Sequence, residues 1–165
     1  MIGSMETKTR STTGAGAAAS LEAHLGYWLR LVSNEVSGAF QRALEERHHI
    51  SVAEWVALNQ LATGADLTPA RLATAMGMTR GAVSKVLDKL ESKKLIVRTT
   101  SSADSRVQEL SLTAHARRTL PSLTEIANGN DEHFFAVLSP EESSTLSELL
   151  RKLATAHHIA RIPVA

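Results

Sequence analysis

A segment near the middle of the chain combines side chains that could bind a charged partner. Thr79 can cap a helix, and Arg80, Ser84 and Lys85 follow it in the sequence. At about 100° per residue such a helix has two unlike sides. The apolar side consists of Val83, Val86, Leu87 and Leu90, and the opposite side of Gly81, Ser84, Lys85 and Asp88. We therefore expect one side to pack and the other to meet a partner.

The small and polar side of this helix has the chemistry of a DNA-reading surface. Backbone N–H groups and the positive dipole end in the first turn attract phosphate. Small residues at Gly81 and Ser84 would let the helix enter a major groove about 12 Å wide. There Arg80 and Lys85 could reach guanine edges or phosphates. The alternative is a solvated helix with a Lys85–Asp88 pair. Because Asp88 would repel phosphate, we interpret it as a local partner for a basic side chain.

A second basic feature follows in a polar loop. Asp104 and Arg106 stand two residues apart between the runs 95–100 and 107–112, which predict the two strands of a hairpin. An aspartate can accept hydrogen bonds from a guanidinium or from loop amides, so that the arginine projects. A projecting arginine fits the narrow, negative minor groove of DNA. An ordinary turn pair is the alternative.

Two helices are predicted ahead of these residues. Apolar residues from Leu21 to Leu44 recur at steps of three and four and predict a long helix over 21–47. The Ser51–Glu54 capping box opens a second helix, whose end is predicted at Gly64. A helix with one apolar side needs a surface against which to bury it, so the long helix is expected to pack on something.

A helix-turn-helix follows. Thr68 and Pro69 supply a cap and a first helical residue, and Gly77 ends this short helix. The next cap, Thr79, comes almost at once, and its helix is predicted to run to about Ser92. Two short helices joined by a tight turn with glycine are typical of this motif.

Two further helices are predicted after the hairpin. Thr113 caps a long helix, in which Pro121 and Gly129 predict a bend or a break. The Ser139–Glu142 capping box, with a proline in the first turn, starts a last helix over 140–155. The fold class is therefore mainly α with a small β-hairpin.

The composition excludes several functional classes. With 165 residues and 43% apolar side chains, the chain is long enough for one ordinary folded domain. The absence of cysteine excludes disulfides, thiolate metal sites and cysteine catalysis. Neither a membrane-spanning stretch nor a secretory signal is recognisable, so we expect a cytoplasmic protein without contact to a membrane. Residues 1–19 have few large apolar groups and are expected to form a flexible tail.

Positive charge is concentrated in the middle of the chain. Residues 66–118 hold ten lysines and arginines against five acids, whereas the remainder is acidic. This distribution favours a module that binds a polyanion, although a charge run can also be a solvated surface. Sequence signatures of catalysis, such as a nucleophile elbow, a P-loop or H-E-x-x-H, are absent. We therefore expect no enzyme and no cofactor.

These segments together resemble the winged helix-turn-helix of MarR-type transcription regulators. The similar stretches are Leu72–Arg98, Asp104–Arg106 and Leu110–Thr113, and the likeness covers about residues 20–155. It extends to the long first helix and to the Leu-Ser-Pro-Glu-Glu start of the last one. The family wing often has consecutive arginines after its aspartate, and here Ser105 replaces the first of them.

The resemblance implies a homodimer, held by its terminal helices, that binds double-stranded DNA. It divides the chain into a tail at 1–19, dimerisation helices at 20–50 and 114–160, and a winged helix-turn-helix lobe at 51–113. Thr79–Lys89 would lie in the major groove, and the wing at the minor groove. The candidate DNA-binding residues are Thr79, Arg80, Gly81, Ser84, Lys85, Lys89, Arg98, Asp104, Ser105 and Arg106.

The predicted function is that of a sequence-specific transcription regulator, acting as a repressor at a near-palindromic operator. A small apolar or phenolic effector would bind between the dimer helices and the lobe. It would act by favouring one spacing of the two helices, one from each protomer, that enter the major groove. The alternative is a winged-helix module whose basic face binds a protein, and salt dependence would distinguish the two.

The seven histidines are the candidate metal ligands. Pairs at helical i, i+4 spacing with a carboxylate are absent among them, and adjacent histidines on a helix point about 100° apart. A surface or dimer-interface role is therefore favoured, and no metal site is predicted. The resemblance to regulators that sense zinc leaves a combination of His24 with His115 or His133 open.

Overall fold

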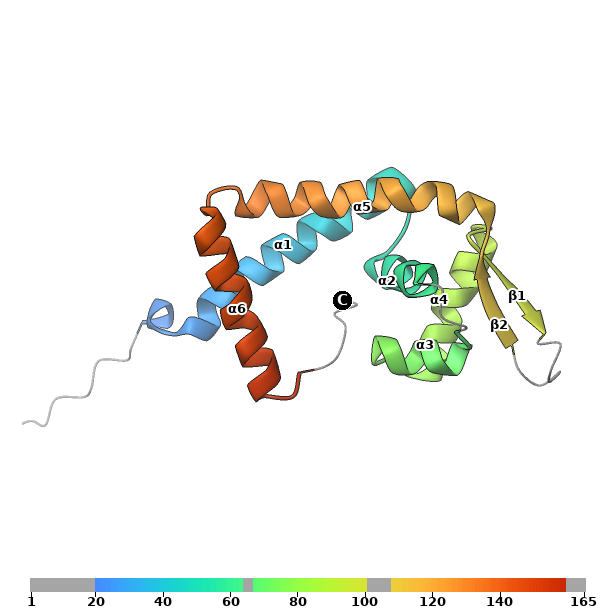
Figure 1. Ribbon diagram of the computed structural model, residues 1–165, viewed down its shortest axis with the longest axis horizontal. Coiled ribbons are helices and arrows are strands. Elements are labelled where there is room, and N and C mark those ends of the chain that lie inside the picture. The colour runs from blue at the N-terminus through green and yellow to red at the C-terminus, as the bar shows by residue number, and fades with distance from the viewer. Residues whose placement is uncertain (1–19, 64–66, 101–107, 160–165) are drawn as a thin grey trace, which may run out of the picture.

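Two long helices, α1 (Leu25–His48) and α5 (Ala114–Phe135), form an arm that leads away from a lobe built by the shorter elements (Figure 1). The computed structural model describes residues 20–63, 67–100 and 108–159. The lobe consists of α2 (Val52–Ala62), α3 (Pro69–Met76), α4 (Arg80–Ser92), β1 (Ile96–Thr100) and β2 (Gln108–Leu112). A short 3-10 helix, η1 (Leu21–Ala23), precedes α1, and α6 (Pro140–Ala156) follows α5.

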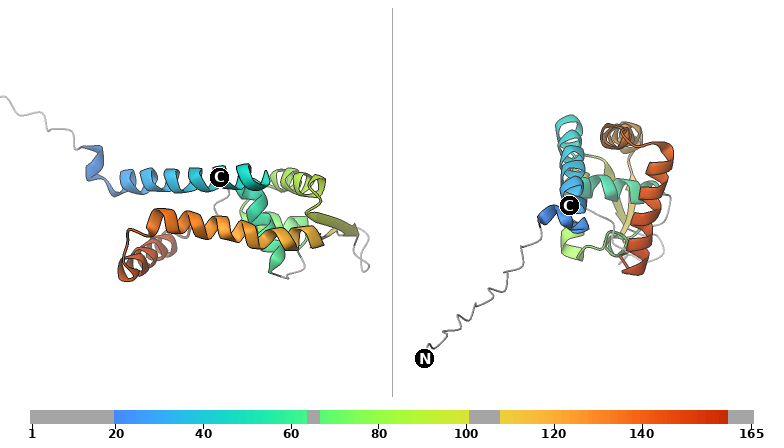
Figure 2. Two further views of the ribbon diagram at one scale, coloured as in Figure 1. Left: turned by 90° about the horizontal axis from the view of Figure 1, so that it is seen from above. Right: turned by 90° about the vertical axis from the view of Figure 1, so that its left-hand side faces the viewer.

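The first helix of the arm, α1, and the last helix, α6, leave most of their large apolar side chains uncovered. Figure 2 shows α1 and α5 side by side, with α6 leaving the far end of α5. Leu44 is the one residue of α1 that is buried, and α6 has none. Within the described part of the chain, none of these helices has both the length and the apolar content needed to cross a bilayer.

Every predicted helix cap after residue 50 is confirmed. In each case the side-chain oxygen of the cap accepts a hydrogen bond from the backbone N–H three residues further on, and this holds for Ser51, Thr68, Thr79, Thr113 and Ser139. The two capping boxes, which begin α2 and α6, are complete. A cap depends on only four consecutive residues, which is why the sequence predicts these helix starts so closely.

The start of the first helix differs from the prediction of one helix over 21–47. His24 is extended, with φ −101° and ψ 125°, and it separates η1 from α1. The Trp28 indole N–H donates to the Glu22 carbonyl oxygen at 2.9 Å and so holds the short turn against α1. The apolar spacing continues across this break, and it therefore could not reveal it.

Of the bend or break predicted at Pro121 and Gly129, the break is wrong, because α5 is a single helix from Ala114 to Phe135. Proline removes one backbone hydrogen bond from a helix. Leu123 and Ile126, on the same helix, are buried in the core, and this packing offsets the loss. The predicted end of α2 at Gly64 lies outside the described residues, and the described helix ends at Ala62.

The hydrophobic core lies in the lobe and continues under the first half of α5. It includes the predicted inner sides of α3 and α4, and its largest fully buried apolar side chains are Leu44, Ile50, Leu58, Leu72, Met76, Val83, Leu87, Leu90, Ile96 and Leu123. The hairpin is antiparallel, with Ile96 opposite Leu112. Leu110 and Leu112 are buried, as their alternation predicts.

Glu54 is the one charged side chain among the described residues that is buried, with 2% of its surface exposed. Its Oε2 accepts from the Ser51 backbone N–H, and its Oε1 accepts from Lys93 Nζ, each at 2.7 Å. Burial by itself raises the pKa of Glu54. The hydrogen bonds from Lys93 and Ser51, together with the lysine charge, outweigh burial and hold this pKa below the ordinary glutamate value.

Glu54→Gln is expected to lower the free energy of unfolding at pH 7 by roughly 1–3 kcal/mol, because Lys93 loses its carboxylate partner. A lowered pKa in the folded state contributes stability above the unfolded value of 4.5, and this contribution is lost as the pH falls through the folded value. The wild-type advantage should therefore narrow at pH 3. Urea unfolding of both proteins, at equal protein concentration, measures the difference in their free energies of unfolding at pH 7 and at pH 3. An equal difference at the two pH values would contradict the stabilising role of the Glu54 carboxylate.

Candidate nucleic-acid interface

The turn between α3 and α4 sets the angle of the helix that carries most candidate site residues. Gly77 has a φ of 62°, in the left-handed region that glycine adopts without strain. The N–H groups of Gly77 and Met78 donate to Thr74 and Ala73 carbonyl oxygens at 3.1 and 3.0 Å and so close the end of α3. Thr79 then caps α4, and the helix-turn-helix is formed as predicted.

The outer side of α4 presents the small and basic residues that the sequence places there. The exposed candidates are Thr79, Arg80, Gly81, Ser84, Lys85 and Lys89. A Cβ added at Gly81 would meet no atom within 4 Å, so the chain's own packing does not require glycine at this position. A small residue there leaves room for an external partner to approach the first turn of α4.

The basic residues on this side keep their charge available. Within the described residues, Arg80, Lys85 and Lys89 make no ion pair. The alternative Lys85–Asp88 pair is therefore not formed. Asp88 does pair with a basic side chain, as we interpreted from the sequence, but its partner is Arg98.

Arg98 lies apart from this exposed set. Side chains alternate along a strand, so Arg98 shares the inner face of β1 with Ile96. Its Nη2 lies 2.5 Å from Asp88 Oδ1, and its Nε lies 3.2 Å from Glu91 Oε2 without hydrogen-bond geometry. Only 18% of the Arg98 side chain is exposed. The structure thus places this candidate as a link between the hairpin and α4.

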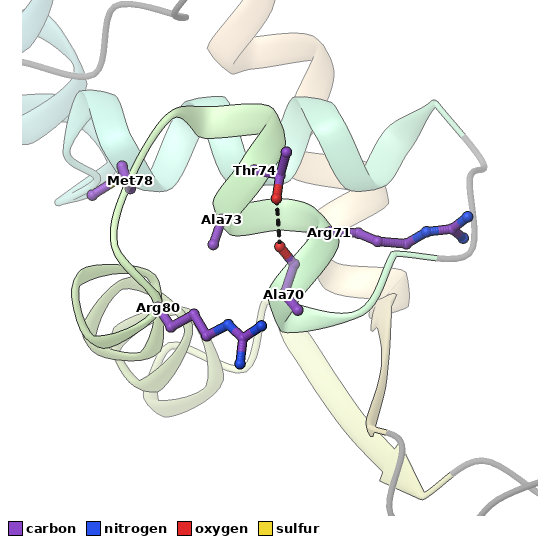
Figure 3. A pocket seen from close by; sticks show the side chains of 6 residues that line it. All are labelled: Ala70, Arg71, Ala73, Thr74, Met78 and Arg80. Carbon is purple, nitrogen blue, oxygen red and sulfur yellow. Dashed lines mark hydrogen bonds between the residues drawn. The ribbon is translucent and has the colours of Figure 1, made fainter.

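A shallow cavity of about 360 Å³ lies between α3 and the start of α4 (Figure 3). The Arg80 side chain runs beneath α3 toward Ala70, whereas Arg71 points away on the other side. Thr74 Oγ1 donates to the Ala70 carbonyl oxygen at 3.2 Å. The sequence pattern did not single out Arg71 and Thr74, although both are exposed on a helix that joins α4 through a tight turn.

The three candidates of the wing loop, Asp104, Ser105 and Arg106, lie outside the described residues. The strands that flank them are described, and the base of the hairpin is held in place. Thr113 Oγ1 donates to the Lys94 carbonyl oxygen at 2.8 Å and so joins the end of the second strand to the start of the first.

Three histidines, His48, His49 and His115, lie near the junction of arm and lobe. Within the described ranges, no three histidine or acidic side chains come together in a way that could hold a metal ion. His48, His49 and His115 line a second cavity, of about 300 Å³, together with Lys93 and Leu95. His48 Nε2 also lies 2.9 Å from Ser122 Oγ and so links α1 to α5.

Comparison with known proteins agrees with this geometry. Residues 48–107 match the family model described as "MarR family". A protein of Thauera aromatica, named for transcriptional regulation of the hcr operon, is 31% identical over 134 residues, which cover 81% of each chain.

Solved structures have the same fold. The Staphylococcus aureus MepR–DNA complex superposes with a TM-score of 0.69 and 27% identity, over 83% of this chain and 99% of that one. Bordetella bronchiseptica BpsR, whose DNA binding is regulated by 6-hydroxynicotinic acid, superposes with a TM-score of 0.71 and 22% identity, over 84% of this chain and 98% of that one. The chain therefore belongs to the MarR family and is a DNA-binding winged-helix transcription regulator, not an enzyme.

Proposed function

We propose that the protein is a homodimeric, effector-responsive repressor that binds a near-palindromic operator. The observation that carries the DNA-reading part is the two-sided α4. Its inner side is fully packed, and its outer side offers Arg80, Lys85 and Lys89 without a partner among the described residues. A helix fixed by one side and charged on the other suits insertion into a major groove.

The proposed contacts divide between two grooves. Thr79, Gly81 and Ser84 would allow close approach in the major groove, where Arg80, Lys85 and Lys89 reach base edges or phosphates. Asp104, Ser105 and Arg106 would act at the minor groove, with the aspartate orienting the arginine. We leave Arg98 out of the direct contacts, because its ion pairs hold it against α4.

The proposed dimer rests on the uncovered apolar side chains of the arm and of α6. They include Leu25, Trp28, Leu29, Val32, Leu146, Leu149, Leu150 and Leu153, each between 38% and 88% exposed. A patch of this kind, spread over helices that bury almost nothing within one chain, is typical of a protein–protein interface. We therefore assign 20–50 and 114–160 to dimerisation and 51–113 to DNA binding.

The proposed effector is a small apolar or phenolic molecule. The cavity of about 300 Å³ lies where the end of α1 meets the start of β1 and of α5, between arm and lobe. BpsR, whose fold is similar, is regulated by a small hydroxylated aromatic acid. A ligand at this junction would act by binding one spacing of the two α4 helices better than the other.

Selection of duplexes from a random pool tests this function. The full chain should enrich a near-palindrome with half-sites about 10 bp apart, and its affinity should fall steeply with salt as phosphate contacts are lost. Added protein should lower transcription from a promoter that overlaps the selected site. Failure to enrich any duplex, together with salt-independent capture of a protein, would support the protein-binding alternative instead.

Gly81→Ala should weaken binding to the selected duplex by roughly 1–3 kcal/mol, because a methyl group would obstruct approach to the base edges. The free energy of unfolding should stay equal or rise by up to about 1 kcal/mol, since alanine favours helix more than glycine does. Fluorescence anisotropy and urea unfolding measure the two quantities.

Gly129→Ala is the matched control, because this helical glycine also has nothing within 4 Å of an added Cβ and lies in the second half of α5. It should change stability in the same direction and leave the affinity per dimer as it is. If Gly81→Ala and wild type bind the selected duplex with equal affinity, the proposal that the outer side of α4 contacts DNA loses its support.

Wild-type protein should sediment as a dimer at micromolar concentration. Replacing Leu149 and Leu153 by serine should give monomers that bind the full site weakly, because the α6 stripe loses two of its exposed apolar side chains. The control replaces Glu148 and Lys152 by serine, at the same spacing on the same helix and with no change in net charge. A monomeric wild type, or a dimeric leucine variant, would count against the proposed interface.

A further inference from the structure

One lysine side chain joins the ends of three helices where the arm meets the lobe. Lys93 follows the last residue of α4, and its Nζ donates to Glu54 Oε1 at 2.7 Å. The same ammonium donates to the backbone carbonyl oxygen of His49, the residue that ends α1. Glu54 lies in the first turn of α2. The end of α4 is therefore tied to the end of α1 and the start of α2 together.

The acceptors of this ammonium are held in place by their own surroundings. Glu54 is 2% exposed, and its second oxygen is occupied by the Ser51 backbone N–H. The Lys93 side chain is 31% exposed. The carboxylate thus cannot turn away without leaving a buried charge without a partner, which is strongly unfavourable.

The other ion pairs of α4 join it to residues of the lobe. Arg98 links it sideways to the hairpin through Asp88 and Glu91. Among the polar contacts of the described residues, the bond from Lys93 to His49 is the one that runs from α4 to α1. Since α1 belongs to the arm, this bond connects the orientation of α4 to the proposed dimer.

We propose that Lys93 is a positioning residue for operator binding: through Glu54 and His49 it fixes the angle between α4 and α1 without itself touching DNA. This inference rests on the proposed binding of a two-half-site operator by a dimer. In a dimer, that angle sets the spacing and tilt of the two α4 helices. Only dimers whose two α4 helices have the spacing and tilt of the operator can bind it. The apparent affinity is therefore proportional to the fraction of dimers in that arrangement.

The position of Lys93 argues against direct contact with bases. It lies at the opposite end of α4 from Arg80, about 20 Å along a helix that rises about 1.5 Å per residue. Its charge is compensated by Glu54. A positioning role and a phosphate contact predict different outcomes, which makes the two separable.

The test uses the full-length double variant Glu54→Gln with Lys93→Met, which removes both charges and so leaves neither buried alone. Circular dichroism and sedimentation should show wild-type helix content and dimers. The dissociation constant for the selected two-half-site duplex should rise about tenfold, as expected if about one molecule in ten keeps the competent spacing. Binding to a single half-site duplex and the salt dependence should match wild type.

Two further variants complete the design. Lys94→Met removes an equally charged neighbour whose exposed side chain makes no ion pair among the described residues, and this variant should bind both duplexes as wild type does. Lys93→Arg, as a single substitution, keeps a cation beside Glu54, and it should therefore retain most of the wild-type affinity for the two-half-site duplex. Should the double variant fail to fold, Glu54→Gln alone should lose affinity for the two-half-site duplex and keep its affinity for the half site, because it weakens the contact between Lys93 and residue 54.

The outcomes that overturn the proposal are distinct. If the folded double variant binds the two-half-site duplex as tightly as wild type does, the contacts of Lys93 with Glu54 and His49 serve stability alone. An equal loss on full and half sites, with a salt slope lower by about one, would identify Lys93 as a direct phosphate contact. If wild type itself enriches no duplex, the proposed function fails before this inference is reached.

Discussion

The burial of one side of α4 is the constraint on which the rest of the structure depends. Val83, Leu87 and Leu90 are completely buried in the lobe. Burial of a side chain of this size contributes about 1.5–3 kcal/mol, more than an exposed ion pair provides. Because this packing fixes the rotation of the helix about its own axis, it also decides which residues face outward. Arg80 and Lys85 are presented without any polar contact having to hold them there.

The features that could be predicted from the sequence are those decided by neighbouring residues. A cap such as Thr79, a left-handed turn such as Gly77 and the apolar side of α4 each depend on a few consecutive positions. The same is true of the exposed candidates on α4, whose outward direction follows from helical periodicity alone. Gly81 was predicted for its small size, and the open space around it agrees with that reason.

What the sequence could not predict depends on distant partners. Lys93 and Glu54 are 39 positions apart, and no local pattern shows that their side chains meet. Arg98 is among the candidate DNA contacts that the resemblance implies, but strand alternation turns it inward. Pro121 predicts a bend or a break in α5, and the helix continues through it without a break. In each case a contact made in three dimensions overrides a local preference.

These distant contacts also change the meaning of the charge distribution. The basic excess of residues 66–118 suggests a broad cationic surface, yet the structure shows two different uses for five of its basic residues. Arg98 and Lys93 are compensated by acids and serve to hold α4 to its neighbours. Arg80, Lys85 and Lys89 keep their charge for an outside partner. Asp88 lies on the same side of α4 as Ser84 and Lys85 and would repel DNA if unpaired, but Arg98 pairs with it and with Glu91. α4 can therefore carry carboxylates that help to position it, while Arg80, Lys85 and Lys89 keep their positive charge.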